Sequence, residues 1–191
     1  MTASESETVG AVDADDVRYQ EAAAHVVEFG LGTETCAIDI DSVDSIVETK
    51  QITRVPRAPD AVEGVMDLRG ETTAVVDPTT YLSVGDGESK ENVLVLDRDE
   101  DKQKIGIRVD DVTEVVTYPE AQIDEGAQLS GIESSAIAAD LVTGVIRKHV
   151  GPVDEDGVPE DVELVLWLDI DAFIRAVGER DGDPADADNH V

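Results

Sequence analysis

The feature that most constrains the fold of this chain is a series of short runs rich in apolar and β-branched residues, each ended by glycine, proline or acidic residues. Runs of this length predict strands rather than helices, because strands in globular proteins average about five or six residues. Turn-like segments join the runs in pairs, which predicts four hairpins. The pairs are 25–32 with 35–40, 62–70 with 72–77, 92–97 with 104–110, and 141–150 with 162–170.

Helical signals are sparse. Residues 170–178 carry apolar side chains at helical spacing before a glycine, which predicts a short C-terminal helix. A shorter helical turn is expected after Asp77, because Pro78 suits the first turn of a helix. Only 3% of the residues are aromatic, so the core has to be built from aliphatic side chains, and their β-branched members favour strands.

Several segments of the chain resemble later segments in the same order. The pairs are 37–48 with 106–117, 62–65 with 142–145, and 73–82 with 165–174. Three matches in one order predict a duplicated β-unit. Short strands with frequent turns are typical of small barrels or sandwiches, and two units of about seventy residues should pack together because each alone buries little core.

The charge of the chain is strongly negative, with 14 basic residues against 45 acidic ones and a net charge of −31. Such a charge repels nucleic acids and anionic membranes. A disordered acidic protein is one interpretation, but the apolar patterning favours a folded protein adapted to high salt, where the Debye length falls to about 3 Å. Residues 1–22 and 179–191 are expected to be a disordered acidic lead and tail around an ordered domain at 23–178.

The location of the protein is constrained by what the sequence lacks. The N-terminus has no apolar signal-peptide core, and no stretch approaches eighteen apolar residues. Cys36 is the only cysteine, so no internal disulfide can form, and its small and apolar neighbours predict an inert buried thiol. We expect a cytoplasmic protein.

No arrangement of residues predicts catalysis. There is no Ser-His-Asp, Cys-His or phosphate-binding glycine pattern. The acidic loop 152–163 places Asp154, Asp156 and Glu163 at three positions of a calcium-binding loop, but Pro152 occupies the first ligand position and the flanks read as strands. We therefore expect a solvated loop, no metal, no cofactor and no enzymatic activity.

A family resemblance covers residues 25 to about 177. The first half of the chain carries, in this order, the motifs F-x-L-G, C-A-I-D-I-x-x-V-x-x-I, I-T-R-V-P-R-A-P, V-x-G-V-M-D-L-R-G and V-V-D. This order of motifs resembles that of the CheW-type chemotaxis adaptor. The second half continues it with G-I-R-V-D-D-V-T-E-V, L-V-T-G-V and L-W-L-D-I-D-A-F. Together with the acidic composition, this suggests a member of halophilic archaeal type.

The resemblance implies a mainly β fold of two intertwined five-stranded SH3-like β-barrel subdomains with a short C-terminal helix. The first barrel would lie mainly in 23–90, the second mainly in 91–168, and the helix at 170–178. The implied function is a scaffold in signalling arrays near the inner face of the membrane. It would couple the cytoplasmic tips of chemoreceptors to the regulatory domain of the histidine kinase CheA.

The resemblance also implies partner-binding residues. Arg69 corresponds to the arginine of the family motif N-L-R-G, in which Asp67 here replaces the asparagine. Ser45 lies where many members carry glutamate. The element that resembles part of the receptor groove comprises Val109, Asp110 and Val112.

The residues around Arg69 allow two physical interpretations. If 64–70 is extended, Asp67 and Arg69 share a face and form an exposed ion pair worth about 0–1 kcal/mol. Alternatively, Arg69 lies in a partly dry groove and presents its donors to a partner, with Gly70 allowing a tight turn beside it. Candidates for the apolar groove, each of which could instead be an ordinary core residue, are Val43, Ile46, Leu68, Val109 and Val112.

Two other classes of function are compatible with the sequence. One is an acidic metal-binding or hydrolytic β-domain, which would require a divalent-ion site. The other is a β-barrel interaction module that acts outside chemotaxis.

Overall fold

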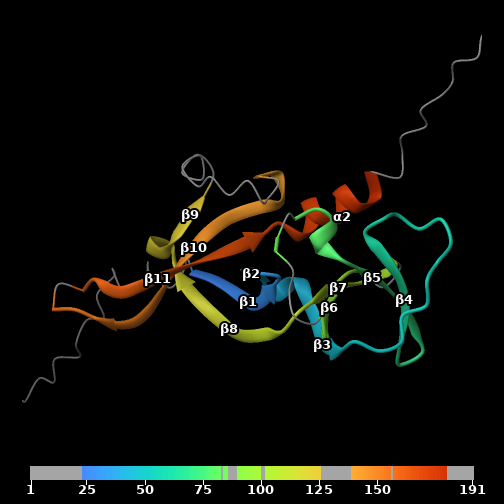
Figure 1. Cartoon of the computed structure of the whole chain (residues 1–191), viewed down its shortest axis with the longest axis horizontal. Helices are drawn as coiled ribbons and strands as arrows, with labels where there is room; N and C mark the ends of the chain where they lie inside the picture. Colours follow the sequence, from blue (N-terminus) through green and yellow to red (C-terminus); the bar gives the residue numbers. More distant parts are fainter. Residues whose placement is uncertain are drawn as a thin grey trace, which may run out of the picture.

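The structure is a computed structural model that describes residues 23–82, 84–85, 90–99, 102–125, 139–155 and 157–179. These residues form two β-sheets that lie along the long axis of the molecule, with helix α2 (Ile170–Glu179) over their junction (Figure 1). The mainly β fold with a C-terminal helix is therefore confirmed.

One sheet has six strands in the order β8-β1-β2-β11-β10-β9. Their bounds are β1 Ala23–Leu31, β2 Glu34–Asp39, β8 Val112–Pro119, β9 Ile123–Glu125, β10 Val142–Val153 and β11 Pro159–Leu168. The other sheet has five strands in the order β3-β6-β7-β5-β4. Their bounds are β3 Val43–Glu48, β4 Val62–Leu68, β5 Glu71–Val76, β6 Asn92–Leu96 and β7 Lys104–Val109.

The elements predicted from local pattern are present. All four predicted hairpins form, as the antiparallel pairs β1–β2, β4–β5, β6–β7 and β10–β11. The turn predicted after Asp77 is the 3₁₀ segment Pro78–Thr80, where Asp77 Oδ1 accepts a hydrogen bond from the backbone N of Thr79 at 3.0 Å. Strands β3, β8 and β9 were not among the predicted hairpins.

The predicted repeat has a structural counterpart. Five strands of the six-stranded sheet follow the same order as the five-stranded sheet when β8, β1, β2, β11 and β10 are matched to β3, β6, β7, β5 and β4. Each sheet has a parallel pair in the equivalent place, β2 with β11 and β7 with β5. Equivalent bulges also occur, between Val62 and Gly64 in β4 and between Val142 and Gly144 in β10.

The chain crosses between the sheets at equivalent points. It leaves β2 through the turn Ile40–Ser42 to enter β3, and it leaves β7 through Asp110 and Asp111 to enter β8. As a result β1 and β2 lie in the sheet built mainly from later strands, whereas β6 and β7 join the sheet of β3, β4 and β5. Sheet membership therefore does not follow a division at residue 90, and the boundary between the barrels stays a prediction.

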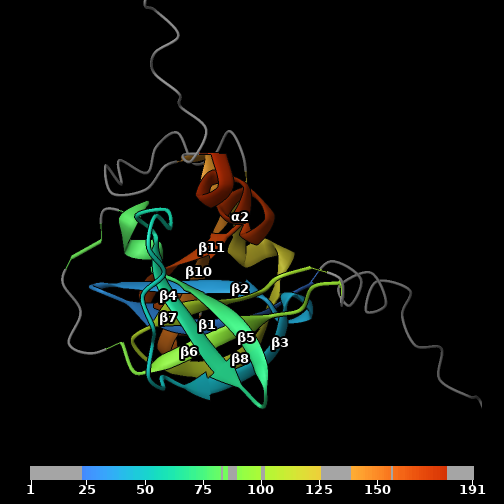
Figure 2. The ribbon, with the colours of Figure 1, turned by 90° about the vertical axis from the view of Figure 1, so that its right-hand side faces the viewer.

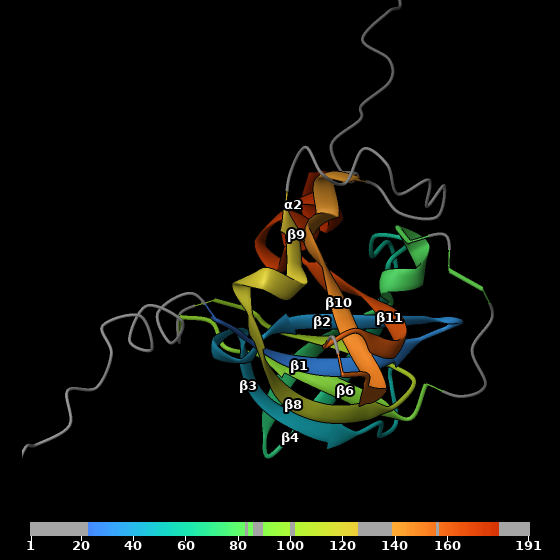
Figure 3. The ribbon, with the colours of Figure 1, turned by 90° about the vertical axis from the view of Figure 1, so that its left-hand side faces the viewer.

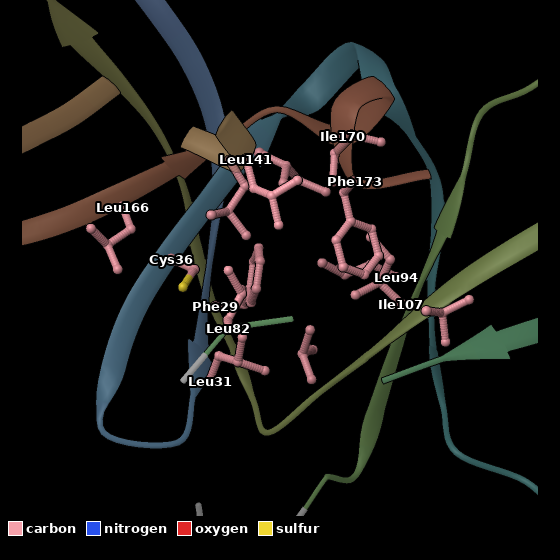
Figure 4. Close-up of a cluster of buried hydrophobic side chains, with 14 of the residues drawn as sticks. Phe29, Leu31, Cys36, Leu82, Leu94, Ile107, Leu141, Leu166, Ile170 and Phe173 are labelled. Carbon is pink, nitrogen blue, oxygen red and sulfur yellow. The ribbon is translucent and has the colours of Figure 1, made fainter. Parts of the chain in front are cut away.

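The two sheets and α2 share one hydrophobic core (Figure 4). Phe29 from β1, Leu94 from β6 and Phe173 from α2 are all buried in it, so it joins parts of the chain that are distant in sequence. Tyr81 packs edge-on against Phe173, with ring centroids 5.7 Å apart. Each sheet also has a smaller cluster of its own, around Val26 in one and Met66 in the other.

Cys36 lies within the shared core, as its neighbours predicted. Burial, with a smaller effect of Glu34, raises the pKa of its thiol to about 12. At neutral pH the thiol is protonated and unreactive. None of the described helices is both long and apolar enough to cross a membrane.

Candidate partner-binding site

Arg69 lies at the tip of the β4–β5 hairpin. Leu68 and Glu71 form the last pair of the ladder, so Arg69 and Gly70 are the two turn residues between them. Their φ angles of +56° and +87° are those of a type I′ turn, the form that suits the twist of a hairpin. Asp67 stabilises the turn, because its Oδ1 accepts a hydrogen bond from the backbone N of Gly70 at 3.1 Å.

This geometry corrects the first interpretation of Arg69. Asp67 and Arg69 do not alternate along one strand, because β4 ends at Leu68. Arg69 is exposed and forms no ion pair with any described residue, so the expected surface pair with Asp67 is absent from this part of the chain. The guanidinium is left available to a partner.

A hollow of about 480 Å³ lies next to this hairpin. It is lined by Lys50, Gln51, Thr53, Val65, Met66, Asp67 and Thr72. Arg69 itself does not line the hollow. Its guanidinium is therefore exposed beside the hollow, and does not lie in the partly dry groove that we expected. Figure 2 shows β4 and β5 at this end of the molecule, together with the segment that precedes β4.

The five apolar residues expected to form one groove are divided among three environments. Val109 is fully buried in the shared core, and Val43 and Val112 pack against the same core. Leu68 packs against the smaller cluster around Met66, whereas Ile46 is 44% exposed. The described part of the structure therefore does not bring these five side chains together, because the strands direct them into different layers, and their role in partner binding stays a prediction.

Asp110 anchors the second crossing to the first hairpin. Its Oδ2 accepts a hydrogen bond from the backbone N of Gly32 at 2.7 Å, and its backbone N donates to Gly30 O at 3.1 Å. Its other carboxylate oxygen is buried without a hydrogen-bond partner among the described residues. These contacts make Asp110 a stabilising residue of the crossing, and its role in partner binding stays a prediction.

Ser45 and Ile46 lie on β3, at the edge of the five-stranded sheet. A bulge separates Val43 from Ser45 in the pairing with β6, and the Ser45 hydroxyl donates to Asp44 Oδ2 at 3.2 Å. The exposed side chain of Ile46 has a counterpart in the repeat, since Val115 on the edge strand β8 is also exposed. Both edges present apolar side chains to solvent.

The sequence interpretation missed three exposed cations, Lys50, Arg54 and Arg57, in the segment before β4. Arg54 and Arg57 lie within the stretch I-T-R-V-P-R-A-P that carried the family resemblance, and Lys50 lies two residues before it, but none of the three was singled out. The available signal was local charge, because 49–61 contains three basic residues and one acidic residue in a chain of net charge −31. Their backbone conformations could not be read from the sequence.

The described residues of the acidic segment 152–163 belong to β10, to β11 and to the turn between them, whereas Asp156 lies outside the described residues. Asp154 Oδ1 accepts a hydrogen bond from the backbone N of Val158 at 2.8 Å, which stabilises this turn. The predicted strand flanks are confirmed. Among the described residues, no group of three or more His, Cys, Asp or Glu side chains is placed to hold a metal ion.

Comparison with known proteins identifies the family. Residues 25–178 match the CheW-like domain. The chain is 29% identical over 157 residues to the chemotaxis protein CheW of Thermotoga maritima, a match that covers 82% of this chain and 91% of the relative. It is 30% identical over 128 residues to chemotaxis protein CheW of Treponema pallidum, covering 64% and 72% of the two chains.

The fold is also found among solved structures. The crystal structure of the scaffolding protein TtCheW from Thermoanaerobacter tengcongensis superposes with a TM-score of 0.60 at 23% sequence identity. The superposition covers 77% of this chain and 84% of that protein. Because the family match includes both sheets and nearly all of α2, the chain belongs to the CheW-like domain family.

Proposed function

We propose that this protein is a chemotaxis adaptor that couples chemoreceptors to the histidine kinase CheA in signalling arrays. The observation that carries the proposal is the family match over residues 25–178, together with relatives that are themselves chemotaxis CheW proteins. An adaptor acts by binding, and the fold offers exposed turns and strand edges as surfaces for partners. The same match supports a scaffold without catalytic activity of its own.

The primary contact in this proposal is the β4–β5 turn, where Arg69 is exposed and held by the Asp67–Gly70 hydrogen bond. A guanidinium has five N–H donors in a fixed plane, which suits directed hydrogen bonds to carboxylates and carbonyls of another protein. Ser45 and Ile46 on the edge strand β3 are secondary contacts. Five further residues support these surfaces from within, because their side chains are partly or fully buried. They are Val43, Leu68, Val109, Asp110 and Val112.

The setting proposed for the protein is the receptor array at the inner face of the membrane of a halophilic archaeon. A net charge of −31 supports this, because about molar salt shortens the Debye length to about 3 Å and screens the repulsion that such a surface creates. Long-range attraction is then weak, so recognition has to depend on apolar packing and hydrogen bonds at contact distance.

The test is Arg69→Glu, measured by capture of the receptor fragment and of CheA at high salt. We expect weaker capture of one or both partners and an unchanged far-UV circular dichroism spectrum, because Arg69 is exposed in a turn and supports no described ion pair. The matched control is Arg175→Glu on α2, which makes the same charge change at another exposed arginine. Equal capture by Arg69→Glu and wild type would remove Arg69 from the interface, and no capture by wild type would refute the adaptor function.

A further inference from the structure

Some lysine and arginine side chains of this acidic protein form ion pairs with carboxylates, and others do not. Six of those in the described residues form ion pairs, namely Lys90, Lys102, Lys104, Arg108, Arg147 and Lys148. Of the other six, which have no ion pair with any described residue, two are Arg98 and the exposed Arg175, and four exposed ones lie in or next to β4 and β5. They are Lys50, Arg54, Arg57 and Arg69, which we call the cationic pole.

Two arginines of the cationic pole have strained backbones. Within the described chain, Arg57 at φ +63° and Arg69 at φ +56° are the non-glycine residues with positive φ. Arg57 is the third residue of a turn closed by a hydrogen bond from Ala58 N to Val55 O at 3.3 Å, and with Pro56 before it this matches a type II turn. Such positions favour glycine or asparagine, and a left-handed conformation costs other residues about 1–2 kcal/mol. Strained residues of this kind often mark functional sites.

The segment that carries these cations is held against the five-stranded sheet. Thr53 and Val65 exchange two backbone hydrogen bonds of 2.8 Å, which fixes Arg54 beside β4. The next residue, Val55, is 43% exposed although it is apolar. Figure 1 shows this segment and the β4–β5 hairpin at the end of the long axis opposite to the β10–β11 hairpin, and Figure 3 views the molecule from the β10–β11 side.

None of the described acidic residues at the same end forms an ion pair with the cationic pole. Asp67 accepts the hydrogen bond from Gly70 N that holds the turn. Glu71 faces Lys104, at 3.8 Å between Nζ and Oε2. Asp60 is exposed and forms no ion pair with a described residue. The four cations are therefore left without intramolecular partners in the part of the chain that the structure describes.

We propose that the cationic pole docks an acidic surface of a partner protein, whose carboxylates pair with Arg54, Arg57 and Arg69 and whose apolar side chain covers Val55. The inference rests on the proposed adaptor function, since it states the chemistry of the partner surface that this end of the scaffold accepts. Charge complementarity favours carboxylates as the acceptors. A nucleic acid is disfavoured because its phosphates would meet the field of the whole chain, which has a net charge of −31.

The first experiment measures the affinity of the full chain for purified CheA and for a soluble receptor fragment by isothermal titration calorimetry. We expect Arg54→Glu/Arg57→Glu to weaken binding to at least one of them by tenfold or more. Arg175→Glu should change both affinities by less than twofold, because Arg175 is exposed on α2 and not on β4, β5 or the segment that precedes β4. Equal affinities for the double variant and wild type would overturn the inference while leaving the adaptor function intact, whereas loss of binding by wild type itself would refute the adaptor function.

A second variant separates binding from stability. Arg57→Gly removes the cation and also relieves the positive φ, so we expect an equal or higher Tm together with weaker partner binding. A residue with only a structural role would show the reverse, a lower Tm with unchanged affinity, and that result would overturn the inference.

Carbodiimide coupling identifies the occupant, because it joins an amine directly to a carboxylate in contact with it. We expect Lys50 to be coupled to an aspartate or glutamate of the bound partner, and substitution of that acidic residue by lysine to restore binding to Arg54→Glu/Arg57→Glu. If sedimentation shows that the wild-type chain alone self-associates and the double variant does not, the occupant is a second copy and the inference is wrong.

Discussion

At the scale of single residues, one buried carboxylate joins three strands of the six-stranded sheet. Glu28 on β1 is fully buried, and its two oxygens accept hydrogen bonds from Tyr118 on β8 and from Lys148 on β10. Burial and the bond to Glu28 raise the pKa of Tyr118 above its usual range. Burial alone would lower the pKa of Lys148, but its hydrogen bonds to Glu114 and Glu28 outweigh this and raise it. Both partners therefore stay in the protonated form that stabilises the Glu28 carboxylate.

Lys148→Met should destabilise the protein by about 3–5 kcal/mol, because it leaves Glu28 as a buried charge without its cation. The control is Arg147→Met at the neighbouring position, where a half-exposed pair with Asp124 is lost at about 0–1 kcal/mol. Urea unfolding followed by circular dichroism measures both values. Equal losses in the two variants would show that Glu28 is not stabilised by Lys148.

At the scale of elements, the same bulge occurs at the start of one strand in each half of the repeat, and in the first half it supports the cationic pole. Gly64 and Gly144 occupy equivalent bulges at the starts of β4 and β10. At Gly64, with φ +155°, a Cβ atom would lie 2.2 Å from the backbone oxygen of Thr53, so only glycine allows the segment with Arg54 to approach β4. The bulge thus supports the placement of the cationic pole.

Gly64→Ala should therefore destabilise the fold by about 3 kcal/mol, at the upper end of ordinary substitutions. Gly70→Ala is the matched control: its φ is +87°, but no atom lies within 4 Å of the added Cβ, so only about 1 kcal/mol of backbone strain is expected. Thermal unfolding of the two variants compares them. A loss for Gly64→Ala no larger than for Gly70→Ala would refute the close approach of Thr53.

At the scale of the whole molecule, the exchange of strands between the sheets joins the two halves into one folding unit. β2 pairs in parallel with β11, and β5 pairs in parallel with β7, so each sheet needs strands from both halves of the chain. The two halves also depend on each other through the hydrophobic core, because Phe29 from the first half packs in one cluster with Leu94 and Phe173 from the second. We therefore expect that neither half keeps its sheet when the other is removed.

A chain divided between residues 90 and 91 tests this dependence. We expect residues 1–90 alone and 91–191 alone to give poorly dispersed amide NMR spectra, and an equimolar mixture to recover the dispersion of the intact chain. The physical reason is that β1 and β2 lose β8 and β11 as partners in the first fragment. A dispersed spectrum from 1–90 alone would show an independent first barrel and contradict the exchange.

The local elements and the family could be predicted because they depend on neighbouring residues. Alternation within each run, and the short segment between paired runs, predicted four hairpins that are present. The repeat predicted two equivalent β-units, although β3 and β8 were not assigned as strands, because polar residues such as Asp44 and Glu114 interrupt their apolar runs.

By itself, the sequence determined the strand content, the C-terminal helix, the repeat and the family, because each follows from residue type and spacing along a short stretch. Only the tertiary structure decided which sheet each strand joins and that Val109 is buried in the core. It also decided that Arg57 and Arg69 occupy left-handed turn positions and form no ion pair with any described residue. These features depend on pairings between residues far apart in the chain, and such pairings are chosen by the shared core rather than by local pattern.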